Sequence, residues 1–318
     1  MDLRINPTPI QEIRERLNDN RFFIKRDDIL PISFGGNKVR KAVLFFDDLE
    51  KQGCDCIVTY GSSSSNHCRI VANLAASKGI PCYIISPNED NRITNNSYMI
   101  KMFGAYVVRC PVTEVSTTIE QTIISLKEKG FYPYFIPGGG HGNIGTQAYV
   151  LAYKEILYFE RSTGVKFDYI FHASGTGTTQ AGLVCGKILY GGASKVIGIS
   201  IARKNPRGRQ VVCDSVNEYL GMLHKDRSND EEHVQFVDKY TVEGYGSFNE
   251  EILETIKLLL IRDGIPMDTT YVGKAFWGMK KYITENYISN KNILFIHTGG
   301  TPLFFNDLEE LINGDNIS

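Results

Sequence analysis

Short apolar segments alternate with longer amphipathic segments along most of the chain. In the first half, strand-like runs at 56–61, 82–86 and 105–110 alternate with runs of helical period at 66–78 and 93–103. Apolar residues that recur every three to four positions favour a helix, whereas short continuous apolar runs favour a buried strand. The pattern therefore predicts repeated strand–helix–strand units.

The same alternation resumes in the second half of the chain. We predict a long helix at about 146–159, a second helix after Thr178, and strands near Tyr134 and at 169–174, 196–201 and 293–298. Continuous apolar strands are typical of parallel sheets that helices cover on both faces. We therefore expect an α/β fold with open twisted sheets, and ligands bound where loops leave the carboxyl ends of the strands.

The composition limits which kinds of molecule the protein is expected to bind. The chain has 318 residues, 42% of them hydrophobic and 22% charged, which is enough for two lobes around a cleft. Its net charge of −1 leaves no basic surplus for a nucleic acid or an anionic membrane. The N-terminal segment has no apolar signal core, and no apolar run approaches the ~20 residues that span a bilayer. We expect a soluble cytoplasmic protein with a small-molecule partner.

The cysteines and histidines favour neither disulfides nor a metal site. No C-x-x-C pair occurs among the cysteines, so reduced thiols are expected. The six histidines show no H-E-x-x-H or Cys/His ligand spacing, and we expect no metal. The seven cysteines are Cys54, Cys56, Cys68, Cys82, Cys110, Cys185 and Cys213.

Four polar segments carry candidate chemistry, and the first is FGGNKVRK at 34–41. The paired glycines let the backbone approach a ligand closely, and Asn37 is an acceptable helix N-cap. A cleft would desolvate Lys38, lower its pKa and free the amine to attack a carbonyl. From this segment alone, an ordinary solvated lysine remains the alternative. A nucleotide P-loop is excluded because Val39 follows the lysine.

The second segment, GSSSSNHCR at 61–69, follows a predicted strand and opens a helix. Its hydroxyls, amide and free backbone N–H groups suit an anion such as a substrate carboxylate. A polar turn that only caps the helix is the alternative. No G-x-S-x-G is present, so a serine-hydrolase elbow is not expected.

The third segment, ASGTGTTQAG at 173–182, also lies between a strand and a helix. Small residues, hydroxyls and a helix N-terminus together favour a phosphate site. A dinucleotide fingerprint fails here because Gln180 replaces its third glycine. We therefore predict a site for one phosphate.

The fourth group lies towards the C-terminus. It comprises EGYG at 243–246, YVGK at 271–274 and the strand end FIHTGGT at 295–301. Its phenols and its strand-end hydroxyl could transfer protons or bind a ring nitrogen, although core tyrosines are common.

The order of these segments resembles the 1-aminocyclopropane-1-carboxylate (ACC) deaminase and D-cysteine desulfhydrase family. This family belongs to the tryptophan-synthase-β-like (fold type II) pyridoxal-5′-phosphate (PLP) enzymes. The resemblance runs over most of the chain, through the motifs KRDD at 25–28, FGGNK, SNH, SGTGTTQAG, EGYG, YVGKA and HTGGTP.

The resemblance implies a role for each cofactor residue. Lys38 would carry PLP as a Schiff base, Asn66 would bind the ring hydroxyl oxygen, and Thr298 would face the pyridine nitrogen. The phosphate would be held by Gly175, Thr176, Gly177, Thr178 and Thr179.

Substrate residues follow from the same resemblance. Ser65 would bind the substrate carboxylate or assist proton transfer, with Ser64 and His67 beside it. Tyr245 and Tyr271 would flank the substrate, and the α-proton would be removed by Lys38, Ser65 or Tyr271.

Several positions depart from the deaminase pattern. Deaminases carry a glutamate after the tyrosine of their YEGK motif, paired with the pyridine nitrogen, whereas this chain has Val272. A neutral partner such as Thr298 weakens the electron sink and suits elimination. His67 fits the desulfhydrase form of the Ser-Asn motif. Ser64 replaces the usual glutamine, and 138–143 replaces a serine-containing loop, so the substrate could differ from both family namesakes.

We therefore predict a PLP-dependent lyase or deaminase that acts on a small amino acid. D-cysteine desulfhydrase activity, which gives pyruvate, sulfide and ammonia, is the preferred reading. The alternatives are ACC deamination, β-replacement by a second nucleophile, and a non-catalytic protein that binds PLP or an amino acid. The resemblance also implies a homodimer with a large PLP-binding domain at 1–44 plus 147–318 and a small domain at 45–146.

Overall fold

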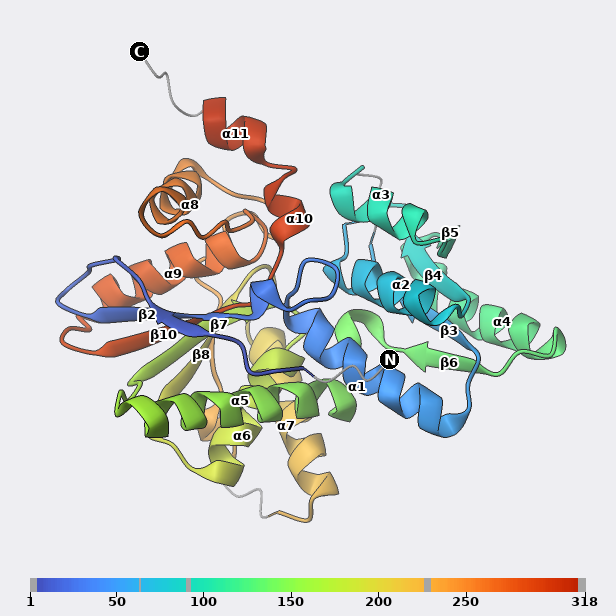
Figure 1. Cartoon of the computed structure of the whole chain (residues 1–318), viewed down its shortest axis with the longest axis horizontal. Coiled ribbons are helices and arrows are strands. Elements are labelled where there is room, and N and C mark those ends of the chain that lie inside the picture. Colours follow the sequence, from blue (N-terminus) through green and yellow to red (C-terminus); the bar gives the residue numbers. More distant parts are fainter. Residues whose placement is uncertain (1–4, 63, 90–92, 226–229, 314–318) are drawn as a thin grey trace. The chain divides into compact units, whose positions relative to one another are not determined.

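The computed structural model describes residues 5–62, 64–89, 93–225 and 230–313, which form two compact units (Figure 1). Unit 1 comprises Pro31–Ser33 and the described residues of Lys38–Gly145. Unit 2 comprises Ile5–Leu30, Phe34–Asn37 and the described residues from Thr146 onward. The domain limits expected from the sequence stay a prediction. Within the described residues, no helix is long and apolar enough to cross a membrane.

The described residues of unit 1 form a four-stranded parallel sheet in the order β5-β4-β3-β6. Helices α2 and α4 both pack against β3 and β4. The strands are β3 (Cys56–Tyr60), β4 (Cys82–Pro87), β5 (Tyr106–Cys110) and β6 (Pro133–Ile136). The helices are α1 (Asn37–Gln52), α2 (Asn66–Lys78), α3 (Asn95–Met102) and α4 (Val115–Glu128), with short 3-10 turns η2 (Val112–Glu114) and η3 (Gly138–Gly140).

The described residues of unit 2 form a six-stranded sheet in the order β1-β2-β10-β7-β8-β9. Only the β1–β2 pair at its edge is antiparallel. The strands are β1 (Ile10–Glu12), β2 (Arg21–Arg26), β7 (Tyr169–Ser174), β8 (Lys195–Ser200), β9 (Gln235–Val237) and β10 (Asn292–His297).

Helices cover both faces of this sheet. In Figure 1, α8 and α9 lie on one side of it, and α5, α6 and α7 lie on the other. Their bounds are α5 (Asn143–Thr163), α6 (Thr178–Tyr190), α7 (Arg207–Met222), α8 (Glu250–Asp263) and α9 (Val272–Glu285). The remaining elements are α10 (Thr301–Phe304), α11 (Leu308–Asn313), η1 (Asp27–Ile29) and η4 (Asp230–His233).

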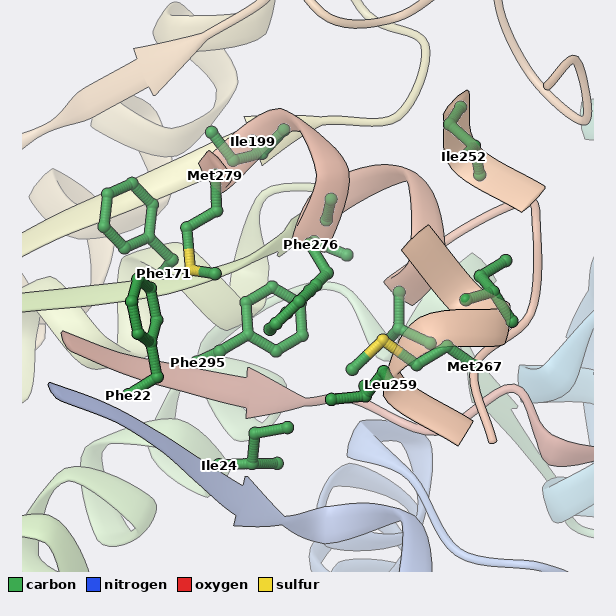
Figure 2. Close-up of a cluster of buried hydrophobic side chains, with 14 of the residues drawn as sticks. Phe22, Ile24, Phe171, Ile199, Ile252, Leu259, Met267, Phe276, Met279 and Phe295 are labelled. Atoms are coloured by element: carbon green, nitrogen blue, oxygen red, sulfur yellow. The ribbon is translucent and has the colours of Figure 1, made fainter. Parts of the chain in front are cut away.

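The apolar core of unit 2 fixes α9 against the sheet (Figure 2). The Phe276 ring of α9 contacts the Phe295 ring of β10 edge to face, with centroids 5.1 Å apart. Such a pair adds about 0.5–1.5 kcal/mol to the burial of its area. A Cβ on Gly278 would lie 2.8 Å from Ile199, so glycine lets α9 approach β8 closely. The residue that precedes α9, Tyr271, is therefore carried on a rigid element.

The predicted α/β class with parallel-rich sheets is confirmed. The helix expected at 66–78 and the strand expected at 169–174 coincide with α2 and β7, and the other predicted elements shift by a few residues. Strand β5 is less covered than the others, because Tyr106 and Val107 are exposed. This strand lies at the edge of its sheet, where fewer neighbours cover it.

Candidate active site

The chain just before Lys38 is bound to two strand-end loops of unit 2. The backbone N of Asn37 donates to Thr298 O at 2.9 Å, and its side-chain amide donates to Thr179 Oγ1 at 3.1 Å. A Cβ on Gly36, which has φ +106°, would lie 2.8 Å from Thr298 O, so only glycine fits. Asn37 thus joins the loop after β10 to the first turn of α6.

Lys38 and Lys41 lie three residues apart on α1 and therefore share one helix face. Lys38 is partly buried, and desolvation lowers its pKa to about 8. Lys41 is fully buried, and no described residue accepts a hydrogen bond from its Nζ. Burial, and secondly the charge of Lys38, lowers the pKa of Lys41 well below its usual value. An anionic ligand group would stabilise both cations.

The helix α2 begins with two residues whose side chains are already oriented. Ser65 is the N-cap, and its Oγ accepts a hydrogen bond from the backbone N of Cys68 at 3.2 Å. Its hydroxyl proton therefore remains able to donate. The Oδ1 of Asn66 accepts from Arg69 Nη1 at 2.7 Å and from Asn96 Nδ2 at 3.0 Å. This leaves Nδ2 of Asn66 as the donor towards a ligand oxygen.

His67 is a buried neutral acceptor. Thr59 Oγ1 donates to Ile136 O, so the 2.8 Å contact between Thr59 Oγ1 and His67 Nε2 requires a proton on Nε2. Burial, followed by the charges of Lys38 and Lys41, lowers the pKa of His67 to about 3. Its Nδ1 has no hydrogen-bond partner among the described residues. The imidazole therefore offers a lone pair and no positive charge.

The turn between β7 and α6 has the features of a phosphate site. Gly177 is the N-cap of α6 with φ +93°, and having no side chain it makes no capping hydrogen bond of its own. The first amides of a helix lack intrahelical partners and favour an anion. Thr178 and Thr179 are buried in the first turn, whereas Gly175 and Thr176 are partly exposed.

The side-chain amide of Gln180 is bonded to two strands of the sheet, so it does not face a ligand. Its Oε1 accepts from Ser174 Oγ at 3.1 Å, and its Nε2 donates to Gln235 O at 2.7 Å. A Cβ on Gly198 would lie 2.1 Å from Gln180 Oε1, so this glycine makes room for the amide. The residue that breaks the dinucleotide fingerprint thus links β7 to β9.

The end of β10 presents Thr298 on a fixed turn. His297 Nε2 contacts Pro266 O at 2.8 Å, which places the proton on Nε2, and its Nδ1 accepts from the backbone N of Gly299 at 3.3 Å. Gly299 has φ +100°, and a Cβ there would lie 2.6 Å from the Cα of Gly36.

Tyr245 and Tyr271 lie side by side in unit 2. Their hydroxyl oxygens are 2.6 Å apart, and their rings meet edge to face with centroids 5.8 Å apart. Either oxygen can be the donor, so the pair can pass a proton.

Val272, which stands where the deaminase motif has a glutamate, is fully buried in the apolar core. Asp268 binds the start of this helix, with its two carboxylate oxygens accepting from the backbone N of Tyr271 at 2.8 Å and of Val272 at 3.2 Å. Burial is the main cause that raises the pKa of Asp268 to about 7.

The structure adds residues that sequence reasoning missed. Asp268 binds the backbone at the start of α9, and His297 binds the backbone of the turn that carries Thr298. The charge of Lys41 lowers the pKa of His67. The spacing of Lys41 from Lys38 was a signal, because residues three apart on a helix are neighbours. Asp268 gave none, and His297 stood in the HTGGTP motif without a role of its own, because their partners are backbone groups that only the fold brings close.

The groups in each unit fit PLP, which carries an aldehyde, a phosphate and a ring oxygen. In unit 1, the amine of Lys38 fits the aldehyde, and the buried Nζ of Lys41 fits an anionic group. In unit 2, the N-terminus of α6 fits a phosphate.

Comparison with known families decides the cofactor. The model of the family described as "Pyridoxal-phosphate dependent enzyme" matches residues 1–299. The chain belongs to this family. PLP is therefore the cofactor of this PLP-dependent enzyme, and its substrates are of the small amino-acid class.

Curated relatives and solved structures show which PLP-dependent enzymes are similar to this chain. It is 33% identical over 319 residues to a D-cysteine desulfhydrase of Yersinia pestis (strain Pestoides F), covering 96% of this chain and 94% of the relative. A D-cysteine desulfhydrase of Serratia proteamaculans (strain 568) is 33% identical with the same coverage. A crystal structure of an ACC deaminase homologue matches with a TM-score of 0.86 and 29% identity over 97% of this chain and 94% of the other.

An O-ureido-L-serine synthase shares the fold, with a TM-score of 0.67 at 17% identity over 98% of this chain and 94% of the other. The fold is therefore the fold type II PLP fold, and the protein is a PLP-dependent lyase or deaminase.

Proposed function

We propose that this enzyme is a D-cysteine desulfhydrase, which converts D-cysteine and water into pyruvate, hydrogen sulfide and ammonia. The observation that carries the proposal is the burial of Val272 in the core at the start of α9. No carboxylate stands at this position, and the family resemblance assigns Thr298 to the pyridine nitrogen. A neutral hydroxyl withdraws fewer electrons than a charged pair would, which is sufficient for expulsion of a thiol and less favourable for opening a ring. The identity to curated D-cysteine desulfhydrases supports the same activity.

In this proposal, residues of unit 1 bind the substrate and remove its α-proton. PLP, when bound, supplies the electron sink for negative charge at the substrate α-carbon. The amine of Lys38 is neutral in a large fraction near pH 8, so it can bind the cofactor and accept the α-proton. The Ser65 hydroxyl and the N-terminus of α2 favour the substrate carboxylate, with Ser64 and His67 beside it.

The residues of unit 2 hold the cofactor and handle the leaving group. The segment at 175–179 would hold the phosphate of PLP, and in unit 1 the amide of Asn66 would donate to its ring oxygen. The hydroxyl pair of Tyr245 and Tyr271 donates a proton to the departing sulfur and recovers it from water. The sulfur leaves with the electron pair of its bond to the β-carbon.

The absorption spectrum of the purified enzyme tests this function, recorded before and after D-cysteine is added, with pyruvate and sulfide assayed in the same cuvette. We expect a near-visible cofactor band that shifts on addition, with both products formed in equal amounts. Lys38→Ala is the matched control and should lose both the band shift and turnover, by at least roughly a thousandfold in kcat/KM.

Each other outcome would redirect the assignment. A shift without pyruvate and sulfide from D-cysteine would reject the desulfhydrase activity. If 2-oxobutyrate then formed from ACC, the deaminase activity would replace it. Full turnover by Lys38→Ala would overturn the mechanism as a whole.

We also propose that the enzyme acts as a homodimer in the cytoplasm. The dimer is what the family resemblance implies, and the cytoplasm agrees with the seven free cysteines, six of them buried. Light scattering would give the mass in solution, and a mass near one chain of 35.7 kDa would contradict the dimer.

A further inference from the structure

Lys274 carries a buried ammonium group to which the proposed reaction gives no role. It lies on α9, three residues after Tyr271, and is fully buried. Lysine is rarely buried so completely unless its charge is compensated. Here Nζ donates to the backbone carbonyl oxygens of Gly244 at 2.7 Å, Ile201 at 3.3 Å and Thr241 at 3.3 Å, and the charge of Asp268 also favours the ammonium.

These three carbonyls come from two segments that α9 does not belong to. Ile201 directly follows β8, and Thr241 and Gly244 lie in the loop between β9 and α8. All of these segments are in unit 2. One side chain of α9 therefore connects two strand-end segments on the edge of the sheet where ligands are expected.

The loop that Lys274 binds is strained. Val242 has φ 55°, a left-handed conformation that a β-branched residue rarely adopts. Thr241 Oγ1 is buried without a hydrogen-bond partner among the described residues. Such features cost free energy and persist only where surrounding contacts hold them. The carbonyls of Thr241 and Gly244, on either side of the strained residue, are the ones that the ammonium binds.

Tyr245 directly follows Gly244, so the bond from Lys274 Nζ to Gly244 O restrains the backbone next to a candidate site residue. Tyr271 stands at the start of the helix that carries Lys274, and its hydroxyl is 2.6 Å from that of Tyr245. Lys274 therefore holds one tyrosine through its own helix and the other through the loop carbonyls. We propose that Lys274 is a positioning residue that keeps Tyr245 in hydrogen-bond contact with Tyr271, an inference that rests on the role of this pair in the proposed function.

The loop has other contacts, so loss of Lys274 should loosen it without unfolding it. Ser247 Oγ donates to Gly244 O at 2.8 Å and accepts from the backbone N of Glu243 at 3.1 Å. The backbone N of Gly244 donates to Thr241 O at 3.0 Å. The bonds from the ammonium group to Thr241, Gly244 and Ile201 disappear, whereas these contacts within the loop remain.

Hydrogen exchange in the holoenzyme without substrate tests the attachment directly. Lys274→Met should speed exchange of the backbone amides at 242–247, while the first turn of α6 keeps its protection. Lys281→Met is the matched control, because its ammonium lies on the same helix but pairs with Glu251 at the surface, 2.6 Å away. Unchanged exchange at 242–247 would overturn the proposal. Lys274→Gln keeps an amide donor and should give an intermediate rate, which serves as the test if the methionine variant does not fold.

A double-mutant cycle separates positioning from a general loss of structure. Lys274→Met should lower kcat/KM by up to about 100-fold, as for a misplaced reacting group. In a Tyr245→Phe background, the same change should cost little more, because it acts through the hydroxyl already removed. Fully additive losses would overturn positioning. Full activity of Tyr245→Phe alone would instead overturn the proposed role of Tyr245, and the exchange experiment would then decide whether Lys274 holds the loop.

Discussion

Lys38, Lys41 and His67 in unit 1 have one electrostatic property in common, which is that burial lowers the pKa of each. The positive charges of the two lysines lower the pKa of His67 further. Near neutral pH this group of bases therefore holds fewer protons than three solvated side chains would. For a reaction that begins with attack by an amine, the neutral form is the useful one.

The pKa of Lys38 predicts how cofactor uptake depends on pH. Because the charged form is disfavoured, the neutral fraction rises about tenfold per pH unit below pH 8 and levels off above it, whereas an ordinary lysine would keep rising past pH 9. We expect the rate at which apoenzyme binds PLP covalently to follow this curve. Stopped-flow absorbance would measure it, with a small free amine as the control for titration of PLP itself. A rise that continues to pH 10 would contradict the lowered pKa.

Thr298 gives a second prediction for a single residue. Thr298→Ala removes the hydroxyl but keeps the carbonyl that binds Asn37, so PLP should stay bound. Loss of one neutral hydrogen bond should slow turnover by roughly 3- to 10-fold. Thr298→Ser retains the hydroxyl and should behave like the parent enzyme in steady-state assays. Equal rates for the alanine and serine variants would exclude the hydroxyl as the partner of the ring.

At this scale, the sequence singled out residues that stand in a motif and missed the role of residues whose partners only the fold supplies. Lys38 and Thr298 could be singled out because each follows a glycine-rich or strand-end motif. Lys274 stands in the YVGK motif but could be given no role from it, because the carbonyls that surround it come from residues 30 and more positions earlier.

Strand ends and glycines position the candidate site at the scale of elements. The turn after β10 and the segment before α1 approach so closely that the Cβ of an alanine at 299 would lie 2.6 Å from Gly36. Neither backbone can move far, because Asn37 N is bound to Thr298 O.

Gly299→Ala should therefore disturb two elements at once. The change adds a strained φ and a steric clash, which together should destabilise the fold by roughly 1–3 kcal/mol and weaken PLP binding. Gly130→Ala is the matched control, since Gly130 also has a positive φ of +86° but nothing within 4 Å of its Cβ. Urea unfolding and PLP titration would measure both effects. Equal losses of PLP affinity in the two variants would argue against the close approach.

Periodicity predicted seven of the ten described strands, but it did not predict β1, β2 or β9, or the helices α4, α7, α8 and α9. For β2, the reason can be read from one residue. This strand reads RFFIKR, and its lysine, Lys25, is fully buried. The ammonium pairs with Glu155 and with Thr8 Oγ1, which compensates its charge. A charged residue inside the strand interrupts the apolar run, so 21–26 was not recognised as a strand. Only the motif KRDD at 25–28 was singled out in this region.

At the scale of the whole molecule, both units contribute candidate cofactor residues. Lys38 and Asn66 belong to unit 1, and the phosphate segment 175–179 and Thr298 belong to unit 2. Folding of either unit alone would therefore supply only part of the set.

Removal of PLP should consequently affect both units. We expect the apoenzyme to unfold at a lower temperature than the holoenzyme, with PLP at a hundredfold excess over its Kd contributing about 2.7 kcal/mol. Hydrogen exchange should slow on PLP binding at 38–41 in unit 1 and at 175–180 in unit 2, while the exposed strand β5 should not respond. Protection confined to one unit would show that the cofactor residues of the other had been misassigned.

The pairing of β2 with β10 has a consequence for synthesis of the protein. These neighbouring strands are encoded at 21–26 and 292–297, so β2 leaves the ribosome roughly 15–55 s before its partner exists. Unit 1 can pair its strands during that interval, since its sheet uses only residues 56–136. Until the second half of the chain is made, β2 lacks its β10 partner, and Phe22, Phe23 and Ile24 lack the later residues that bury them, so we expect the nascent chain to offer a binding site to chaperones that recognise short apolar segments. Translation speed over the second half of the messenger RNA sets how long that site stays open.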